Sequence, residues 1–383
     1  MDFDYTEEQK AIQGMVRDFT EAEIAPGAEE RDSTGQFPYE LYKKLGNLGI
    51  IGMRFPKEYG GTNSDFLSIC HAAREIARVD VSLAVTLMVA AMGALHLMVQ
   101  GTEARKEEWK EKYILPVVRG EATCSGAFTE PDAGSDTRAF KTTAVLDGDE
   151  WVINGSKAFI TNAGLDNNLF VNVLCLTEIP QRQHSFIFVP TGTRGYKVMP
   201  KYRKMGWRSS ATAELVFEDC RVPAENLLGV KGLGRKYLVE DFFLLARLET
   251  SAIALGLAQA CFEKAFEYAK QRYAFGKPIS KFQHVQSMLV DMALELELSE
   301  LLLNKATLQL QRGEKNLKML AMVKYFICDF ANKAAYDSVQ IFGGIGILDE
   351  CPVSRYYRDA RPLNIADGTT QIMKRLIARE LGC

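Results

Sequence analysis

The sequence has few of the residues that most often bind metals or cross-link small domains. Its 383 residues include only four histidines and eight cysteines, and no two cysteines form a CxxC or another short pair. The cysteines are Cys70, Cys124, Cys175, Cys220, Cys261, Cys328, Cys351 and Cys383. This spacing predicts free, mostly buried thiols in a reducing compartment, and we expect no metal site.

The sequence also lacks a basic patch and a basic, apolar leader. A net charge of −3 argues against a nucleic-acid partner, and the acidic start Met1 to Glu8 argues against a secretory signal. The longest apolar run, Leu83–Val99, is short for a membrane span, so we expect a buried helix. These observations predict a cytoplasmic protein with no membrane or nucleic-acid partner. A G-x-G-x-x-G motif opening a βαβ unit is missing, which argues against a separate NAD site.

Local patterns divide the chain into three parts. A capping box at Thr6–Gln9 opens a series of helices that extends to about residue 118. Strand-like runs follow, with hairpin turns expected at Asp147-Gly148 and at Asn154-Gly155. After Gly234 the apolar spacing is helical again, and one helix is expected over residues 317–342.

A mainly α protein with a central β domain is therefore predicted. The expected parts are an N-terminal helical domain (residues 1–120), a middle β-barrel-like domain (121–231) and a C-terminal four-helix bundle (232–383). With 47% hydrophobic residues, the chain can bury a core large enough for such a molecule.

The segment Ile365–Ile372 places a carboxylate, Asp367, on a turn of small residues ahead of an amphipathic helix. Considered alone, Asp367 is best interpreted as a helix cap, because aspartate is among the residues preferred at that position. The other motifs of the chain favour a catalytic role instead.

Five segments occur in a characteristic order. They are Phe128-Thr-Glu-Pro-Asp-Ala-Gly-Ser-Asp136, Lys157-Ala-Phe-Ile-Thr-Asn-Ala163, Gln271-Arg-Tyr-Ala-Phe-Gly-Lys277, Gln340-Ile-Phe-Gly-Gly-Ile-Gly346, and Tyr357-Arg-Asp-Ala360 ahead of Asp367-Gly-Thr369. Each segment alone is also compatible with an ordinary turn, helix end or solvated arginine. Together the sequence resembles the acyl-CoA dehydrogenase family over nearly its whole length.

The resemblance implies an FAD site shared between two subunits of a homotetramer. Residues expected around the flavin ring are Phe128, Thr129, Ser135, Phe159 and Thr161. Residues expected to reach the FAD of a neighbouring subunit are Arg272, Phe275, Gln340, Gly343 and Gly344. Thr369 and Gln371 are also expected to contact FAD. An arginine fork suits a pyrophosphate, and glycine permits close approach of the backbone.

The resemblance also implies the reaction, which is α,β-dehydrogenation of an acyl-CoA thioester. Asp367 is expected to take the α-proton while the β-hydride passes to N5 of FAD, and the backbone N–H of Asp367 is expected to help hold the thioester oxygen. Electrons would then pass to an electron-transferring flavoprotein. The expected substrate-binding residues are Ser135, Arg247, Ala366 and Gly368.

The turn differs from the usual Tyr-Glu-Gly-Thr of the family, because Ala366 and Asp367 replace the first two residues. Asp is shorter than Glu by roughly 1–1.5 Å. Another group in the family places its base just before an arginine, but Ala246 occupies that position here, so Asp367 remains the candidate. A small residue at 366 and a shorter base favour an alicyclic substrate such as cyclohexanecarboxyl-CoA.

Other interpretations stay open at this point. The substrate could be a short or branched linear acyl-CoA. The protein could be a flavin oxidase resembling nitroalkane oxidase, which also uses Asp at this turn, or an acyl-CoA-binding protein without activity. The physiological direction could also be that of an enoyl-CoA reductase.

Overall fold

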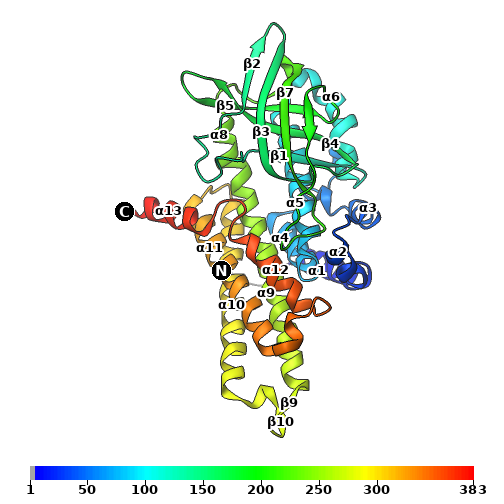
Figure 1. Cartoon of the computed structure of the whole chain (residues 1–383), viewed down its shortest axis with the longest axis vertical. Helices are drawn as coiled ribbons and strands as arrows, with labels where there is room; N and C mark the ends of the chain where they lie inside the picture. The colour runs from blue at the N-terminus through cyan, green and yellow to red at the C-terminus, as the bar shows by residue number, and fades with distance from the viewer. Residues whose placement is uncertain (1–4) are drawn as a thin grey trace.

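Helices form the first and last parts of the chain, and a sheet lies between them (Figure 1). The computed structural model describes residues 5–383. The N-terminal helices are α1 (Glu7–Phe19), α2 (Ala28–Thr34), α3 (Tyr39–Asn47), α4 (Phe66–Ala77), α5 (Val81–Gln100), α6 (Lys106–Trp109) and α7 (Leu115–Val118). The predicted order of helices, sheet and helices is confirmed, whereas the domain limits at residues 120 and 231 stay a prediction.

The middle strands pair into one mixed eight-stranded sheet. They are β1 (Thr123–Ala127), β2 (Thr143–Asp147), β3 (Glu150–Thr161), β4 (Asn168–Glu178), β5 (Gln183–Pro190), β6 (Tyr196–Val198), β7 (Thr212–Pro223) and β8 (Leu227–Leu228). Their order is β6-β7-β3-β2-β4-β5-β8, with β1 beside β4. Within the described residues this sheet does not close, so the barrel-like description is not confirmed.

One of the two predictions of a hairpin turn is wrong. The turn at Asp147-Gly148 does join β2 to β3. At Asn154-Gly155, however, β3 continues as one strand, and its register against β7 shifts between Ile153 and Gly155. Gly155 has φ +142°, and a Cβ there would lie 2.7 Å from the Thr142 hydroxyl. The Asn-Gly pair therefore forms a bulge, because its neighbours in the sheet decide its conformation.

The apolar run predicted as a buried helix forms α5, whose first turn is capped by the carboxylate of Asp80. By length and composition α5 could cross a membrane, but most of it is buried inside the protein. It packs against α4, the long helix α9 and β1. Asn162 after β3 donates to the Thr86 carbonyl at 3.3 Å, and Asn172 of β4 donates to the Gly93 carbonyl at 2.9 Å. The helix thereby joins the sheet to the helical parts.

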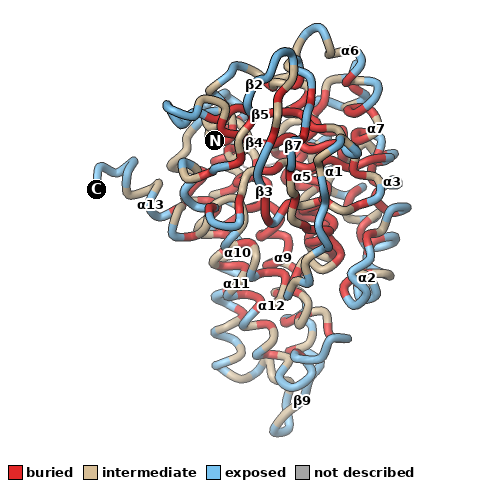
Figure 2. The backbone as a smooth tube through the Cα atoms, turned by 45° about the horizontal axis from the view of Figure 1, so that its top comes forward, coloured by how far each residue is buried: buried red, intermediate tan, exposed pale blue. Residues whose placement is uncertain are grey.

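The C-terminal helices pack around α9. They are α8 (Gly234–Tyr237), α9 (Phe243–Gln271), α10 (Gln283–Gln311), α11 (Leu317–Phe342), α12 (Pro352–Leu363) and α13 (Thr370–Leu381), and the short strands β9 (Tyr273–Ala274) and β10 (Lys277–Pro278) follow α9. The limits of α11 match the prediction. The first part of α9 is buried, whereas the tip at β9 is exposed (Figure 2).

Asp359 of α12 ties the C-terminal helices to the loop before β7. Its carboxylate accepts the Trp207 backbone N–H at 2.6 Å, and its carbonyl accepts the Trp207 indole N–H at 2.9 Å. Burial raises the pKa of Asp359 to about 7; Asp32 and Asp80 add to this effect, while the Trp207 N–H and Arg355 oppose it. A group of this kind makes the stability of the fold depend on pH.

Replacing Asp359 with Asn should raise the melting temperature at pH 8. The pKa of about 7 in the folded protein exceeds the ordinary value of 3.8, so stability falls as the pH rises from about 4 to about 7. Asn retains an oxygen for the Trp207 N–H but has no charge to bury. We expect a rise of about 2–4 °C per kcal/mol recovered and a weaker decline between pH 4 and pH 7.

Melting curves recorded by circular dichroism at pH 4 to 8 would measure this change. The control is Asp349→Asn, because the Asp349 side chain is 77% exposed. Unchanged melting of Asp359→Asn at every pH would contradict the prediction.

Candidate active site

Asp367 lies on the turn between α12 and α13, with its backbone in the left-handed region at φ 53°. Gly368 follows at φ 104°, where a Cβ would lie 2.7 Å from the Met373 methyl carbon. The cap of α13 is Thr369, whose hydroxyl accepts the Ile372 N–H at 3.2 Å. The interpretation of Asp367 as a helix cap is therefore wrong, and its carboxylate is available for another role.

Three buried side chains hold this turn. Thr250 Oγ1 donates to Oδ2 of Asp367 at 2.8 Å. Arg247 Nε donates to the backbone carbonyl of Asp367 at 3.3 Å, and Lys324 Nζ donates to the carbonyl of Gly368 at 2.6 Å. Thr250 and Arg247 come from α9, and Lys324 comes from α11. The turn is fixed by helices that are distant from it in sequence.

Two cations thus bind backbone oxygens beside the carboxylate. Burial lowers the pKa of Arg247 to about 10, although the charge of Asp367 opposes this shift, so Arg247 is charged at neutral pH. Burial also lowers the pKa of Lys324. Among residues 5–383 no ion pair to the Asp367 carboxylate is found, and the bonds of Arg247 and Lys324 go to carbonyl oxygens of the turn. The carboxylate is therefore held by a hydroxyl and is not neutralised by an ion pair.

The alternative base position that the resemblance suggests, just before Arg247, contains Ala246. Glu249, two residues after Arg247, forms a buried ion pair with Arg54 at 2.6 Å. Its carboxylate is thus committed to another partner, which leaves Asp367 as the candidate base.

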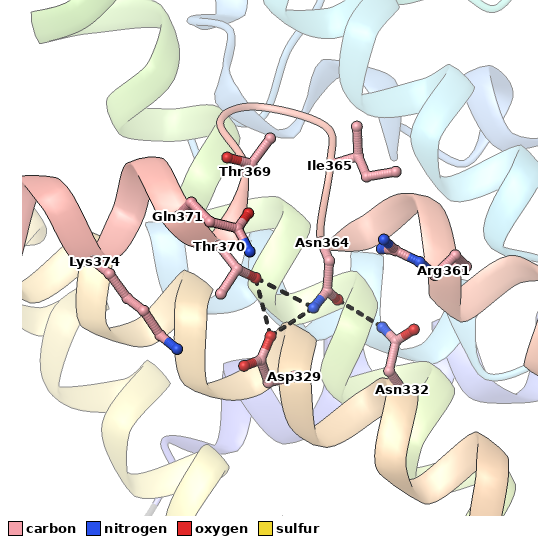
Figure 3. A pocket seen from close by; sticks show the side chains of 9 residues that line it. All are labelled: Asp329, Asn332, Arg361, Asn364, Ile365, Thr369, Thr370, Gln371 and Lys374. Atoms are coloured by element: carbon pink, nitrogen blue, oxygen red, sulfur yellow. Dashed lines mark hydrogen bonds between the residues drawn. The ribbon is translucent and has the colours of Figure 1, made fainter. Parts of the chain in front are cut away.

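A hydrogen-bond network anchors both ends of the turn to α11 (Figure 3). Asp329 accepts from Asn364 Nδ2 and, at 3.0 Å, from Thr370 Oγ1. Asn332 in turn donates to Asn364 Oδ1 at 2.6 Å. An open pocket of about 630 Å³ adjoins this network and includes two predicted FAD ligands, Thr369 and Gln371. Its lining also includes Arg361, Ile365 and Lys374.

The predicted flavin-binding segments around Thr129 and Phe159 lie side by side, because the Ala158 N–H donates to the Thr129 carbonyl at 2.8 Å. Buried Lys157 of β3 donates to Glu130 at 2.8 Å and to the Phe128 carbonyl at 3.0 Å. The backbone N–H of Thr142 donates to the same carboxylate oxygen, Oε1, at 2.8 Å, and the backbone N–H of Lys141 donates to Oε2 at 2.7 Å. This buried ion pair sets the shape of the loop that follows β1.

Several groups in this region are free to contact a ligand. Within the described part of the chain, the hydroxyls of Thr129, Ser135 and Thr161 have no hydrogen bond to protein atoms and are not buried. The Phe159 ring is 64% exposed and lies 5.3 Å from the ring of Tyr202. Free hydroxyls beside an uncovered aromatic ring suit a ligand that is both aromatic and polar, as a flavin is.

A continuous set of contacts links this loop to the candidate base. The Phe128 ring lies 6.3 Å from the Phe243 ring, and the Arg247 guanidinium lies 5.3 Å from Phe243. Arg247 then contacts Asp367. The structure therefore brings the flavin-binding segment and the turn of Asp367 to one region.

The remaining predicted FAD ligands lie elsewhere in the chain. Arg272 follows the last residue of α9, 25 residues after Arg247, which is roughly 37 Å along a helix. Phe275 is 96% exposed and lies between β9 and β10, the strands at the tip of the molecule (Figure 1). Tyr268 stacks on Phe342, so the end of α11, with Gln340, Gly343 and Gly344, is close to the same tip. Within one chain these residues do not join the site of Asp367.

Comparisons with known proteins agree with this arrangement. Models of the N-terminal, middle and C-terminal domains of acyl-CoA dehydrogenases match residues 6–121, 125–220 and 226–382. The chain therefore belongs to the acyl-CoA dehydrogenase family, which is FAD-dependent, and it is an oxidoreductase.

Whole-length relatives include the probable acyl-CoA dehydrogenase YngJ of Bacillus subtilis, which is 39% identical over the full length of both chains. The structure of butyryl-CoA dehydrogenase from Megasphaera elsdenii matches with a TM-score of 0.94 at 36% identity and covers both chains completely. A chain from a structure described as the electron transferring flavoprotein of Acidaminococcus fermentans matches with a TM-score of 0.94 at 38% identity, covering 100% of this chain and 99% of that chain.

Several residues of the site were not predicted from the sequence. Lys324 could have been noticed as a single charge within the apolar face of its helix. Lys157 and Glu130 lie inside the motifs but were not recognised as a pair. Thr250 has no local signal, because its partner is 117 positions away.

Proposed function

We propose that this protein catalyses α,β-dehydrogenation of an acyl-CoA thioester and that Asp367 removes the α-proton. The observation that supports this role best is the environment of the Asp367 carboxylate. Thr250 orients it, Arg247 and Lys324 hold the backbone behind it, and no described cation forms a direct ion pair with it. A general base needs a fixed position and a free lone pair within reach of the proton that it takes.

FAD supplies the hydride acceptor when it is bound. Thr129, Ser135 and Thr161 would hold the flavin through their free hydroxyls, and Phe159 would cover one face of the ring. The pocket at the N-terminus of α13, with Thr369, Gln371 and the cations Arg361 and Lys374, suits the negatively charged phosphates.

A second copy of the chain would complete the FAD site. Arg272, Phe275, Gln340, Gly343 and Gly344 are exposed at the tip of the molecule, where no described residue of the same chain covers them. Their distance from Asp367 supports at least a dimer, and the homotetramer is what the resemblance implies. We also propose an electron-transferring flavoprotein as the electron acceptor, since a chain from a structure described by that name has the same fold. A cytoplasmic location is part of the proposal.

For the substrate we propose an alicyclic acyl-CoA such as cyclohexanecarboxyl-CoA. Ala366 leaves space beside the reacting carbons, and the shorter Asp367 suits a substrate carbon that lies nearer to the turn. The apolar helix α5 borders this region through Met88, whose sulfur lies 3.8 Å from the Thr250 hydroxyl. The alternative is a short linear or branched acyl-CoA, which the similarity to butyryl-CoA dehydrogenase favours.

An anaerobic titration would test the proposal. The purified flavoprotein would be mixed with butyryl-, isobutyryl- and cyclohexanecarboxyl-CoA while flavin absorbance is followed. Fast bleaching by the ring thioester supports the alicyclic substrate, and bleaching by the other two alone would contradict it. Absence of bleaching by all three would contradict acyl-CoA dehydrogenation. Steady peroxide formation in air without a carrier would favour the oxidase alternative.

A further inference from the structure

Two residues on one face of α9 hold both the main chain and the side chain of Asp367. Arg247 and Thr250 are three positions apart, so their side chains leave the helix on the same side. Arg247 binds the backbone carbonyl at 3.3 Å, and Thr250 binds the carboxylate oxygen Oδ2 at 2.8 Å. One short helical segment therefore fixes both the position of the residue and the direction of its carboxylate.

The partner of the Asp367 carboxylate is a hydroxyl, and this choice affects how well the carboxylate can accept a proton. A cation at 2.8 Å would favour the ionised carboxylate so strongly that it would be a poor proton acceptor. A hydroxyl supplies direction without a full charge, and among the described residues only Thr250 donates a hydrogen bond to this carboxylate. The other oxygen, Oδ1, has no hydrogen bond to the described protein atoms. Oδ1 is therefore available to accept the α-proton of the substrate.

The Thr250 hydroxyl has a single hydrogen and two neighbouring acceptors. Met88 Sδ lies at 3.8 Å, whereas Asp367 Oδ2 lies at 2.8 Å. A thioether is a weak acceptor and a carboxylate is a strong one, so the hydrogen is directed to Asp367. Thr250 is 2% exposed, and water therefore competes little for the bond.

We propose that Thr250 is a positioning residue that fixes the carboxylate of Asp367 so that Oδ1 faces the α-hydrogen of the substrate. The proposal rests on the proposed role of Asp367 as the base. A short side chain has little reach to spare, and a misplacement of about 1 Å can lower a rate on the order of a hundredfold. The hydroxyl thus helps an aspartate to act as the base, a role for which the longer glutamate is usual in the family.

The test compares Thr250→Val, which has the same shape but no donor, with Thr250→Ser, which retains the hydroxyl. The substrate is whichever of butyryl-, isobutyryl- and cyclohexanecarboxyl-CoA bleaches the wild-type flavin fastest. For Thr250→Val we expect kcat to fall about tenfold with KM within about twofold, and the kinetic isotope effect of α-deuterated substrate to increase. Thr250→Ser should restore most of kcat.

Thr307→Val is the matched control, because Thr307 is also buried and its hydroxyl donates to a helix carbonyl, that of Leu303, at 2.8 Å. This variant should retain the wild-type kcat and isotope effect. FAD content and melting temperature are measured for all variants, so that loss of folding is separated from loss of positioning.

Asp367→Asn is assayed in parallel to separate the two hypotheses. If Asp367→Asn bleaches as fast as the wild type, the proposed base is wrong, whatever Thr250→Val does. If Asp367→Asn is inactive and Thr250→Val has a normal kcat and isotope effect, only the role of Thr250 is overturned. A fall in kcat that Thr250→Ser does not restore would also overturn it.

Discussion

Replacing Asp367 with Asn should lower the rate of flavin reduction about a thousandfold, which lies within the range ascribed to general-base catalysis. Asn has nearly the same shape, and its amide oxygen can still accept the hydrogen bond from Thr250. It cannot take a proton at neutral pH. We therefore expect substrate binding, FAD content and melting temperature to change little, while single-turnover bleaching of the flavin almost stops.

Stopped-flow absorbance under anaerobic conditions measures this rate, and binding of the thioester is followed separately through the shift of the flavin spectrum. Asp291→Asn is the control, since Asp291 is exposed on α10. Bleaching by Asp367→Asn within tenfold of the wild type would show that Asp367 is not the base.

Replacing Lys157 with Met should lower the free energy of unfolding by about 3–5 kcal/mol, because removal of one partner of a buried ion pair leaves the other charge uncompensated. Lys157 is fully buried and Glu130 nearly so. Burial raises the pKa of Glu130, but Lys157 and the N–H donors outweigh it, so the pKa lies below its ordinary value of 4.5. Loss of Lys157 also frees the Phe128 carbonyl and loosens the loop proposed to hold the flavin, so FAD should dissociate more readily.

Urea unfolding at pH 7 and the absorbance of retained FAD measure these two effects. The control is Lys197→Met, which breaks a Lys-Glu pair of 2.6 Å at the surface of the same sheet. We expect it to change stability by less than about 1 kcal/mol. The double variant Glu130→Gln/Lys157→Met should recover part of the loss, because no buried charge remains. Equal effects of Lys157→Met and Lys197→Met would contradict the prediction.

The native pair also predicts a pH dependence. Since the pKa of Glu130 is lower in the folded protein than its ordinary value, its contribution to stability is present above about pH 4.5 and is lost as the pH falls through the folded value. The profile of Lys157→Met should show a smaller loss in this range than the wild type.

Local sequence patterns predicted those elements that depend on neighbours in the chain. The capping box at Thr6 forms as expected, with hydrogen bonds in both directions between Thr6 and Gln9. The helix over residues 317–342 has the predicted limits. The same patterns failed at Asn154-Gly155, where pairing with β7 overrides the tendency to turn. At Asp367 the local preference alone would favour a helix cap, but Thr369 caps that helix instead.

The order of motifs along the chain was sufficient to recognise the family and a carboxylate at position 367. Only the tertiary structure decided how that carboxylate is held. Thr250, Arg247 and Lys324 reach the turn from α9 and α11, and Lys157 meets Glu130 across 27 positions. A residue's neighbours in sequence decide its caps and turns through local hydrogen bonds. The partners of a buried charge are decided instead by the packing of distant helices and strands, which excludes water and leaves each polar group only the contacts that the fold provides.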